Sequence, residues 1–138
     1  MTTDEGSGPA LPAPVLRPED WSGEFAERVN AGNLDGAVAL YAPDAHFLPP
    51  EGGEPLVGRD RIRPVLAGLI AARTRFRGRV VRAVVVGDVA VLYTDFEGTK
   101  VEASGETVGV RSRAVEVLRR RSDGGWQLIV GDPNGRGQ

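Results

Sequence analysis

The apolar residues of this 138-residue chain change their spacing near residue 75, and that change constrains the fold more than any other feature. Before it, they recur at helical intervals; Trp21, Phe25 and Val29, for example, form one apolar face of a helix. After it, they follow the two-residue period of β-strands. Helices grouped ahead of consecutive strands favour an α+β domain, since parallel α/β folds alternate the two elements.

Three helices are expected in the N-terminal half. The first covers residues 18–31 and ends at Gly32, and the second begins after Asn33, which can cap it, and ends before Pro43. A short strand over 45–48 follows, and then a loop over 49–55 that is forced by prolines and glycines. The third helix is expected over 59–73, directly after Gly58.

Four long strands are predicted in the C-terminal half, over residues 75–86, 89–97, 107–121 and 126–132. Gly87 and Asp88 fit a two-residue hairpin between the first two. Apolar residues stand at consecutive positions in these two strands, which predicts that both faces of the sheet are covered. The helices can cover only one face, so we expect a homodimer through the other.

Composition restricts the class of protein. The length and the 41% hydrophobic content fit one domain over residues 17–134, with a flexible tail over 1–16 and a loose end over 135–138. A net charge of -2 gives no sign of nucleic-acid binding, and no apolar run reaches the roughly 20 residues of a membrane span. Because no signal-peptide pattern is visible, a cytoplasmic protein is expected.

The chain has one histidine and no cysteine, which leaves little for a metal site. No carboxylate spacing matches a calcium-binding loop, no glycine-rich loop suits a phosphate, and no serine-nucleophile motif is present. We therefore expect neither a metal nor another cofactor.

One long stretch resembles a known superfamily. Residues 25–45, Phe-Ala-Glu-Arg-Val-Asn-Ala-Gly-Asn-Leu-Asp-Gly-Ala-Val-Ala-Leu-Tyr-Ala-Pro-Asp-Ala, are similar to the nuclear transport factor 2-like superfamily, which includes the SnoaL-like polyketide cyclases and the ketosteroid isomerases. Val-Gly-Arg at 57–59 resembles the family's entry to its third helix, and residues 123–133 look like its closing hairpin. The resemblance covers about residues 18–134. It implies a cone-shaped α+β barrel, in which three N-terminal helices pack on a curved, mainly antiparallel sheet around a small-molecule pocket, usually in a homodimer.

The chemistry of the ketosteroid isomerases transfers poorly to this chain. The position that matches their oxyanion-donor tyrosine is Phe25, which has no donor, and the position that matches their general base is Pro49, which cannot accept a proton. Their second donor falls near residues 114–118, where Glu116 is the one acid. Steroid isomerisation by that mechanism is therefore not expected.

A second branch of the superfamily, similar to limonene epoxide hydrolase, uses an Asp-Arg-Asp arrangement. Asp95, Arg113 and Asp132 are the right residue types for it, although no local motif joins them.

Four residues are candidates for proton transfer: His46, Tyr93, Asp95 and Glu116. The unperturbed pKa of a histidine side chain lies near 6.5, which makes His46 a candidate base at neutral pH, although a partly exposed strand residue is the plainer interpretation. Tyr93 and Asp95 share one strand face, which points either into the pocket or toward a dimer partner or the sheet rim. Glu116 and Arg113 lie on opposite faces of the 107–121 strand, and the sequence does not decide which face lines the pocket.

Further residues are predicted to contact a ligand. They comprise apolar wall residues, an arginine that can bind a carboxylate or polarise an oxygen, and an acid at the end of the last strand: Trp21, Phe25, Tyr41, Leu48, Leu66, Arg113 and Asp132. An apolar pocket with few polar groups is the usual form of a small-molecule site.

Two functions remain open at this point. The first is a SnoaL-like enzyme that performs cofactor-free acid–base chemistry, such as isomerisation, cyclisation or hydration, on an apolar oxygenated molecule. The second is a non-catalytic ligand-binding or dimeric association module, which Phe25 and Pro49 favour. Two titratable groups within about 3 Å of a common point inside a closed cavity would favour the enzyme, and a cavity lined only by apolar side chains would favour the binding module.

Overall fold

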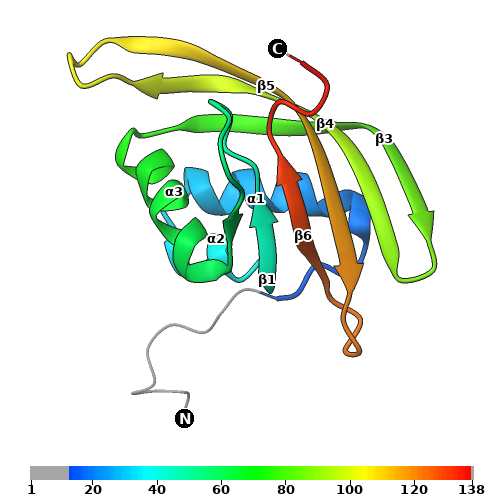
Figure 1. The fold of residues 1–138 in the computed structure, drawn as a ribbon. Coiled ribbons are helices and arrows are strands. Elements are labelled where there is room, and N and C mark those ends of the chain that lie inside the picture. Colours follow the sequence, from blue (N-terminus) through cyan, green and yellow to red (C-terminus); the bar gives the residue numbers. More distant parts are fainter. Residues whose placement is uncertain (1–12, 138) are drawn as a thin grey trace.

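The structure, a computed structural model, describes residues 13–137 and contains helices and a single six-stranded sheet (Figure 1). In chain order the elements are a 3-10 helix (Pro18–Asp20), α1 (Trp21–Asn30), α2 (Leu34–Val38), β1 (Tyr41–Phe47), β2 (Leu56–Val57), α3 (Arg59–Ala71), β3 (Arg75–Val86), β4 (Val89–Val101), β5 (Thr107–Arg120) and β6 (Trp126–Asp132). This combination confirms the α+β class.

The sheet has the strand order β2-β1-β6-β5-β4-β3. Strands β3 to β6 form the predicted antiparallel meander, whereas β1 pairs in parallel with β6, so the sheet is mixed. The hairpin between β3 and β4 turns at Gly87, whose φ of 58° lies in the left-handed region that glycine tolerates. The helices gather on one side of the sheet (Figure 1).

The second predicted helix is too long, and the first strand begins earlier than expected. Helix α2 ends at Val38, and Tyr41, which was assigned to the helix, begins β1. Pro43 lies inside β1, where it breaks no pairing with β2, because β2 pairs only with His46 and Phe47. Strand β2 itself falls just after the predicted loop and was not expected.

The two ends of the described segment pack against the domain. Val15 lies within the predicted tail, yet its side chain is buried and its carbonyl accepts a hydrogen bond from the Trp126 N–H at 2.8 Å. Near the other end, the Arg136 N–H donates to the Arg113 carbonyl at 3.1 Å. The remainder of the predicted tail, residues 1–12, lies outside the described residues.

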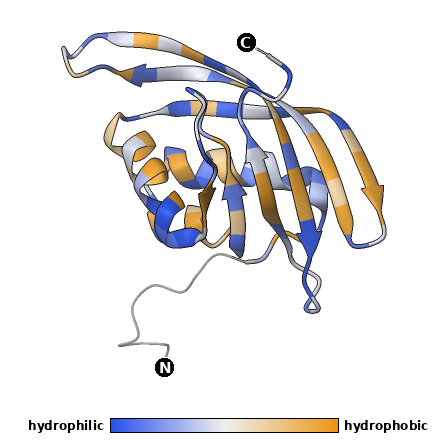
Figure 2. Ribbon diagram, in the orientation of Figure 1, coloured by the Kyte–Doolittle hydropathy of each residue, from blue (hydrophilic) through white to orange (hydrophobic). Residues whose placement is uncertain are grey.

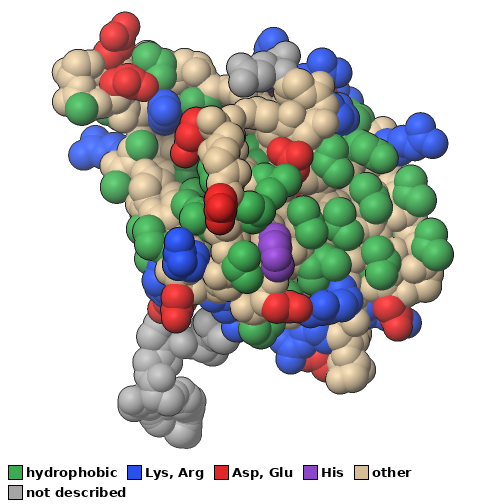
Figure 3. All heavy atoms as spheres, viewed as in Figure 1, with side chains coloured by type: hydrophobic (Ala, Val, Ile, Leu, Met, Phe, Trp, Pro, Cys, Tyr) green, Lys and Arg blue, Asp and Glu red, His purple; other side chains and the backbone are tan. Residues whose placement is uncertain are grey.

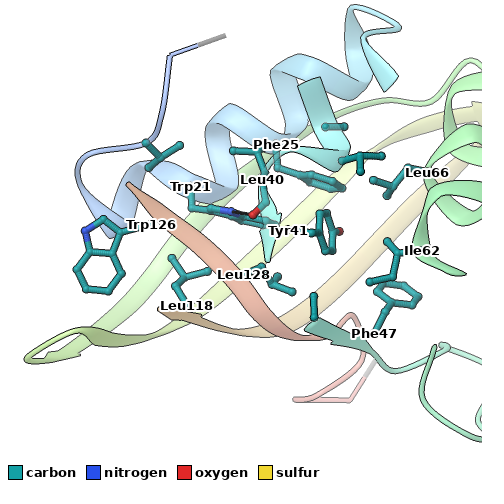
Figure 4. Close-up of a cluster of buried hydrophobic side chains, with 14 of the residues drawn as sticks. Trp21, Phe25, Leu40, Tyr41, Phe47, Ile62, Leu66, Leu118, Trp126 and Leu128 are labelled. Carbon is teal, nitrogen blue, oxygen red and sulfur yellow. Dashed lines mark hydrogen bonds between the residues drawn. The ribbon is translucent and has the colours of Figure 1, made fainter. Parts of the chain in front are cut away.

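The core fills the space between the helices and one face of the sheet (Figure 4). Trp21 is fully buried, its ring stacks on Phe25 with centroids 5.2 Å apart, and its indole N–H donates to the Leu40 carbonyl at 2.9 Å. Stacked aromatic pairs contribute about 0.5–1.5 kcal/mol beyond the area they bury. These contacts fix α1 against β1, so that Phe25 and Tyr41 face the same interior space.

None of the helices in residues 13–137 combines the length and the apolar character that a membrane crossing requires.

Candidate active site

A cavity of about 390 Å³ lies between the helices and the inner face of the sheet. Aromatic and aliphatic side chains form most of its wall, including Phe25, Phe47, Leu66, Phe76 and Phe96. Gly78 makes room for one of these rings, since a Cβ atom there would lie 2.6 Å from Cε1 of Phe96. The size and lining are those of a small-molecule site.

Successive side chains of β5 point to opposite faces of the sheet, and this alternation decides which of them reach the cavity. Ala114, Glu116 and Leu118 are buried on the inner face, whereas Arg113 and Arg119 are exposed on the outer face. The structure thus settles the orientation that the sequence left open, and it brings Glu116 into the cavity wall.

Glu116 is held by two hydroxyl groups from different elements. Its side chain is buried, and Oε1 accepts hydrogen bonds from Ser22 Oγ of α1 at 2.7 Å and from Thr94 Oγ1 of β4 at 2.8 Å. The two hydroxyl oxygens lie 2.9 Å apart. Both partners bind the same carboxyl oxygen, which fixes the orientation of the group.

Burial raises the pKa of Glu116 to about 7. The hydrogen bonds from Ser22 and Thr94 and the positive charge of Arg136 favour the ionised form, and they offset only part of this increase in pKa. A carboxyl group whose pKa lies near neutrality can take up and release protons at physiological pH, which an ordinary glutamate cannot do efficiently. Perturbed groups of this kind in a cavity are typical of functional sites.

Tyr41 supplies a second polar group to the same cavity (Figure 4). Burial raises its pKa above that of free tyrosine, and the charge of Glu116 raises it further. The phenol therefore stays protonated at neutral pH. Because Tyr41 lines the cavity, its hydroxyl can donate a hydrogen bond to an oxygen of a bound molecule.

The other three candidates for proton transfer lie on the outer face of the sheet. His46 is exposed, pairs with Val130 and has Nδ1 3.1 Å from the Asp44 carbonyl oxygen. Tyr93 pairs with the outer residue Val115. None of these residues lines the cavity, and neither does Asp95, which pairs with Arg113 across β4 and β5.

Asp95 takes part in a charged cluster rather than in the cavity. Its Oδ1 lies 2.7 Å from Nη2 of Arg136, and its Oδ2 lies 3.6 Å from Nη2 of Arg79. The hydrogen bond from Arg136 is the main reason that its pKa is lowered. The same Arg136 nitrogen donates to the Thr94 carbonyl at 2.8 Å, so the C-terminal segment is fastened to the strand that carries Thr94.

Some of the residues predicted to contact a ligand line the cavity, and others lie outside it. Phe25, Tyr41, Leu66 and Asp132 line the cavity. Trp21 packs behind Phe25, and neither Leu48 nor Arg113 forms part of the wall. At the rim, the Asn134 amide donates to the Pro50 carbonyl at 3.3 Å, and the Ser112 hydroxyl donates to the Pro133 carbonyl at 2.9 Å.

Sequence reasoning missed three contributors to the site: Ser22, Thr94 and the hydroxyl role of Tyr41. A signal existed for the first two. Ser22 falls on the buried side of α1, and Thr94 stands at an inner-face position of β4 between Leu92 and Phe96. A hydroxyl at an otherwise apolar buried position needs a partner, and Glu116 is the partner of both.

A comparison with family models identifies the family of this chain. The model for the SnoaL-like domain matches residues 23–129, which is most of the described segment. The chain belongs to the SnoaL-like domain family. Among curated proteins, epoxide hydrolase LasB of Streptomyces lasalocidi is 44% identical to this SnoaL-like domain over 64 residues. That match covers 44% of this chain and only 22% of LasB, so it spans about a fifth of the length of the curated relative.

Solved structures share the fold of this SnoaL-like domain. A ketosteroid isomerase-like protein from Erwinia carotovora atroseptica superposes with a TM-score of 0.69 at 19% identity, covering 83% of this chain and 95% of that one. A protein provisionally named a calcium/calmodulin-dependent protein kinase type II association domain, from Thiobacillus denitrificans, gives 0.70 at 22% identity, with coverages of 87% and 95%. At these identities the likeness establishes the nuclear transport factor 2-like fold.

Proposed function

We propose that this SnoaL-like domain is a cofactor-independent enzyme, in which Glu116 moves a proton on an apolar, oxygenated molecule held in the cavity. The observation that carries the proposal is the buried carboxyl group of Glu116, whose pKa is raised to about 7 in the cavity wall. Tyr41 adds a phenol donor to the same cavity. A carboxyl group and a phenol in one cavity support an acid–base site over a purely apolar binding cavity.

An epoxide is the substrate class that we propose, because the curated relative is named an epoxide hydrolase. The Tyr41 hydroxyl donates a hydrogen bond to the epoxide oxygen and polarises the C–O bond. The Glu116 carboxylate takes a proton from a water molecule as the water oxygen attacks an epoxide carbon and the C–O bond breaks. Glu116 then returns the proton to the new alkoxide, so a vicinal diol forms and the enzyme ends in its starting state.

The ketosteroid isomerase mechanism is not part of the proposal. Phe25 lies in the cavity wall at the position of the expected oxyanion donor, and its ring has no hydrogen to donate. Pro49 stands at the position of the expected base and has no group that accepts a proton.

The test is hydrolysis of 1,2-epoxydodecane, followed as formation of the diol. We expect Glu116→Gln to lower kcat/KM by about 100- to 10,000-fold, the usual contribution of a positioned acid or base. In the unaltered protein, kcat/KM should rise with pH and level off above about 7, where Glu116 is ionised. Tyr41→Phe should lower kcat, because the epoxide oxygen loses its donor.

The matched control is Asp95→Asn, which removes a carboxylate from the other face of the sheet. It should leave the pH profile unchanged. If Glu116→Gln keeps full turnover, Glu116 is not the proton carrier. If the cavity binds the epoxide without any turnover, the domain is a ligand-binding module.

We also propose that the sheet curves into a cone around this cavity and that two copies associate through its outer face. Hydrophobic side chains gather on one face of the molecule beside the histidine (Figure 3). Val84, Val86 and Val89 are 38%, 72% and 42% exposed. Hydrophobic residues predominate where β3 and β4 approach their hairpin (Figure 2). Contiguous apolar surface of this kind usually marks an interface between proteins.

A further inference from the structure

We propose that the ligand of this cavity is a long apolar carboxylic acid, whose carboxylate binds Lys100 at the cavity mouth while its reactive oxygen reaches Tyr41 and Glu116. The position of the reactive oxygen rests on the function proposed above. The position of the carboxylate rests on separate residues at the other end of the cavity.

The cavity wall extends along the inner face of β5. Its wall includes Glu116 near one end and Val110 near the other. They are six positions apart, which corresponds to about 20 Å at roughly 3.3 Å per residue of strand. The inner-face residues between them are Ser112 and Ala114, which are small, and aromatic rings of β3 and β4 lie beside them. A slot of this length with an apolar middle suits a chain rather than a compact ring system.

Lys100 lies at the open end on the inner face of β4. The inner residues that precede it on this strand are Ala90, Leu92, Thr94, Phe96 and Gly98, so Lys100 is the first charged group of the series. It lines the cavity. Its recorded partner within residues 13–137 is Glu102, at 3.8 Å between Nζ and Oε2, with both side chains a little under half exposed. An exposed pair at that distance contributes little, so the ammonium group can bind a ligand anion.

Thr74 provides an independent observation at the same end. It precedes β3, and the register Arg75 to Thr99 places it across from Lys100. Its side chain is 2% exposed and forms part of the cavity wall. Among the described residues, its Oγ1 is the one buried side-chain oxygen or nitrogen without a hydrogen-bond partner. A buried hydroxyl without a partner is costly, and a carboxylate at Lys100 would accept its hydrogen bond.

The charge at this end favours a single negative charge on the ligand. One ammonium group from Lys100 faces the mouth, and Arg111 lies at the rim. A phosphate group favours a glycine-rich turn or a helix N-terminus, and neither occurs among the described residues that line the cavity. A carboxylate needs only the ammonium group and one or two hydrogen-bond donors.

The test compares two probes of equal chain length, dodecanoate and dodecan-1-ol, titrated into the full chain by calorimetry at pH 8. We expect dodecanoate to bind at least about tenfold more tightly, a difference of about 1.4 kcal/mol. Lys100→Gln should remove that preference by weakening dodecanoate about tenfold and leaving dodecan-1-ol unchanged. Lys100→Arg should retain most of it.

Arg77→Gln is the matched control, since it removes an exposed positive charge from the outer side of neighbouring β3. It should change neither affinity. The inference is overturned if dodecan-1-ol binds as tightly as dodecanoate, if neither probe binds, or if Arg77→Gln weakens dodecanoate as much as Lys100→Gln does.

The same titrations with Glu116→Gln separate this inference from the proposed function. Dodecanoate has no reactive oxygen at the inner end, so Glu116→Gln should keep the preference for dodecanoate. If the unaltered protein shows no preference for dodecanoate, while its epoxide turnover still depends on Glu116, only the carboxylate site is rejected. A preserved preference without epoxide turnover would reject the proposed reaction alone.

Discussion

The two faces of the same strands carry opposite kinds of carboxyl group. On the inner face, Glu116 is buried against hydroxyl groups and its pKa is raised to about 7. On the outer face, Asp95 lies between Arg79 and Arg136, and its pKa is lowered. The two acids stand on adjacent strands, and their register partners Leu92 and Arg113 show the same contrast. The environment, rather than the residue type, decides which acid can carry protons at neutral pH.

The contrast extends to packing. The inner face of β5 ends in Leu118, which is fully buried, whereas its neighbour Val117 on the outer face is only partly buried. The inner face therefore supports folding and the cavity, and the outer face is available for association. Substitutions on one strand can separate these roles.

The largest effect is expected from truncating the inner face. Leu118→Ala should lower the free energy of unfolding by about 2–5 kcal/mol, because a buried leucine leaves a cavity. Val117→Ala, one residue away, should cost less than about 1.5 kcal/mol in dilute protein, since its side chain is already partly exposed. Urea unfolding at low protein concentration measures both values. Equal losses would contradict the division between the two faces.

Glu116→Gln should change how stability depends on pH. The folded pKa of about 7 lies above the unfolded value near 4.5, so the folded state binds the proton more tightly. The stability of the unaltered protein should therefore fall as pH rises from 4.5 to 7, by on the order of 3 kcal/mol from this group. Glutamine stays neutral and still accepts the hydrogen bonds from Ser22 and Thr94, so the variant should lack this fall.

Urea unfolding at pH 5 and pH 8 tests the difference. Asp95→Asn is the control from the outer face, and it should keep the fall between these pH values, because the pKa of Asp95 is shifted in the opposite direction. A Glu116→Gln protein that loses as much stability as the unaltered one over this range would show that the fall does not come from the titration of Glu116.

The smallest effect on folding is expected from Val117→Arg. It places a charge among the exposed valines of the outer face and should raise the dissociation constant of the proposed dimer at least about tenfold, while the stability of the monomer changes by roughly 0.5 kcal/mol or less. Sedimentation velocity gives the association state. Leu16→Arg, at an exposed apolar residue in the N-terminal segment, is the control and should not alter it. A monomer at micromolar concentration before any substitution would remove the basis of the proposed dimer.

Much of the fold could be predicted from local patterns. The two-residue period located β3, β5 and β6 almost to the residue, because alternation is imposed by one buried face, whereas β4 extends to Val101, four residues beyond its predicted end. Prediction was poorest at residues 39–47, where a helical spacing of Tyr41 competed with strand pairing that depends on distant β6. Pairing between residues nearly 90 positions apart leaves no local trace in the sequence.

The site was less predictable than the fold, for a physical reason. The role of Glu116 depends on the face of β5 that meets the helices, and both faces mix polar and apolar residues. Its raised pKa comes from burial, and its orientation comes from Ser22, which lies 94 positions away. His46 and Asp95 have suitable side chains, but the same alternation places them outside the cavity.

Strand β6 contains one residue more than its partner between the pairs Val117–Val130 and Leu118–Leu128. Because of this irregularity, Leu128 and Gly131 both face inward, and Asp132 pairs with the outer residue Val115. Deleting Ile129 would leave the pairs Val117–Val130, Glu116–Gly131 and Val115–Asp132 in place, because the extra residue lies outside all of them. In evolutionary terms, one codon of this strand could be lost while Glu116 and Asp132 keep their positions in the cavity wall.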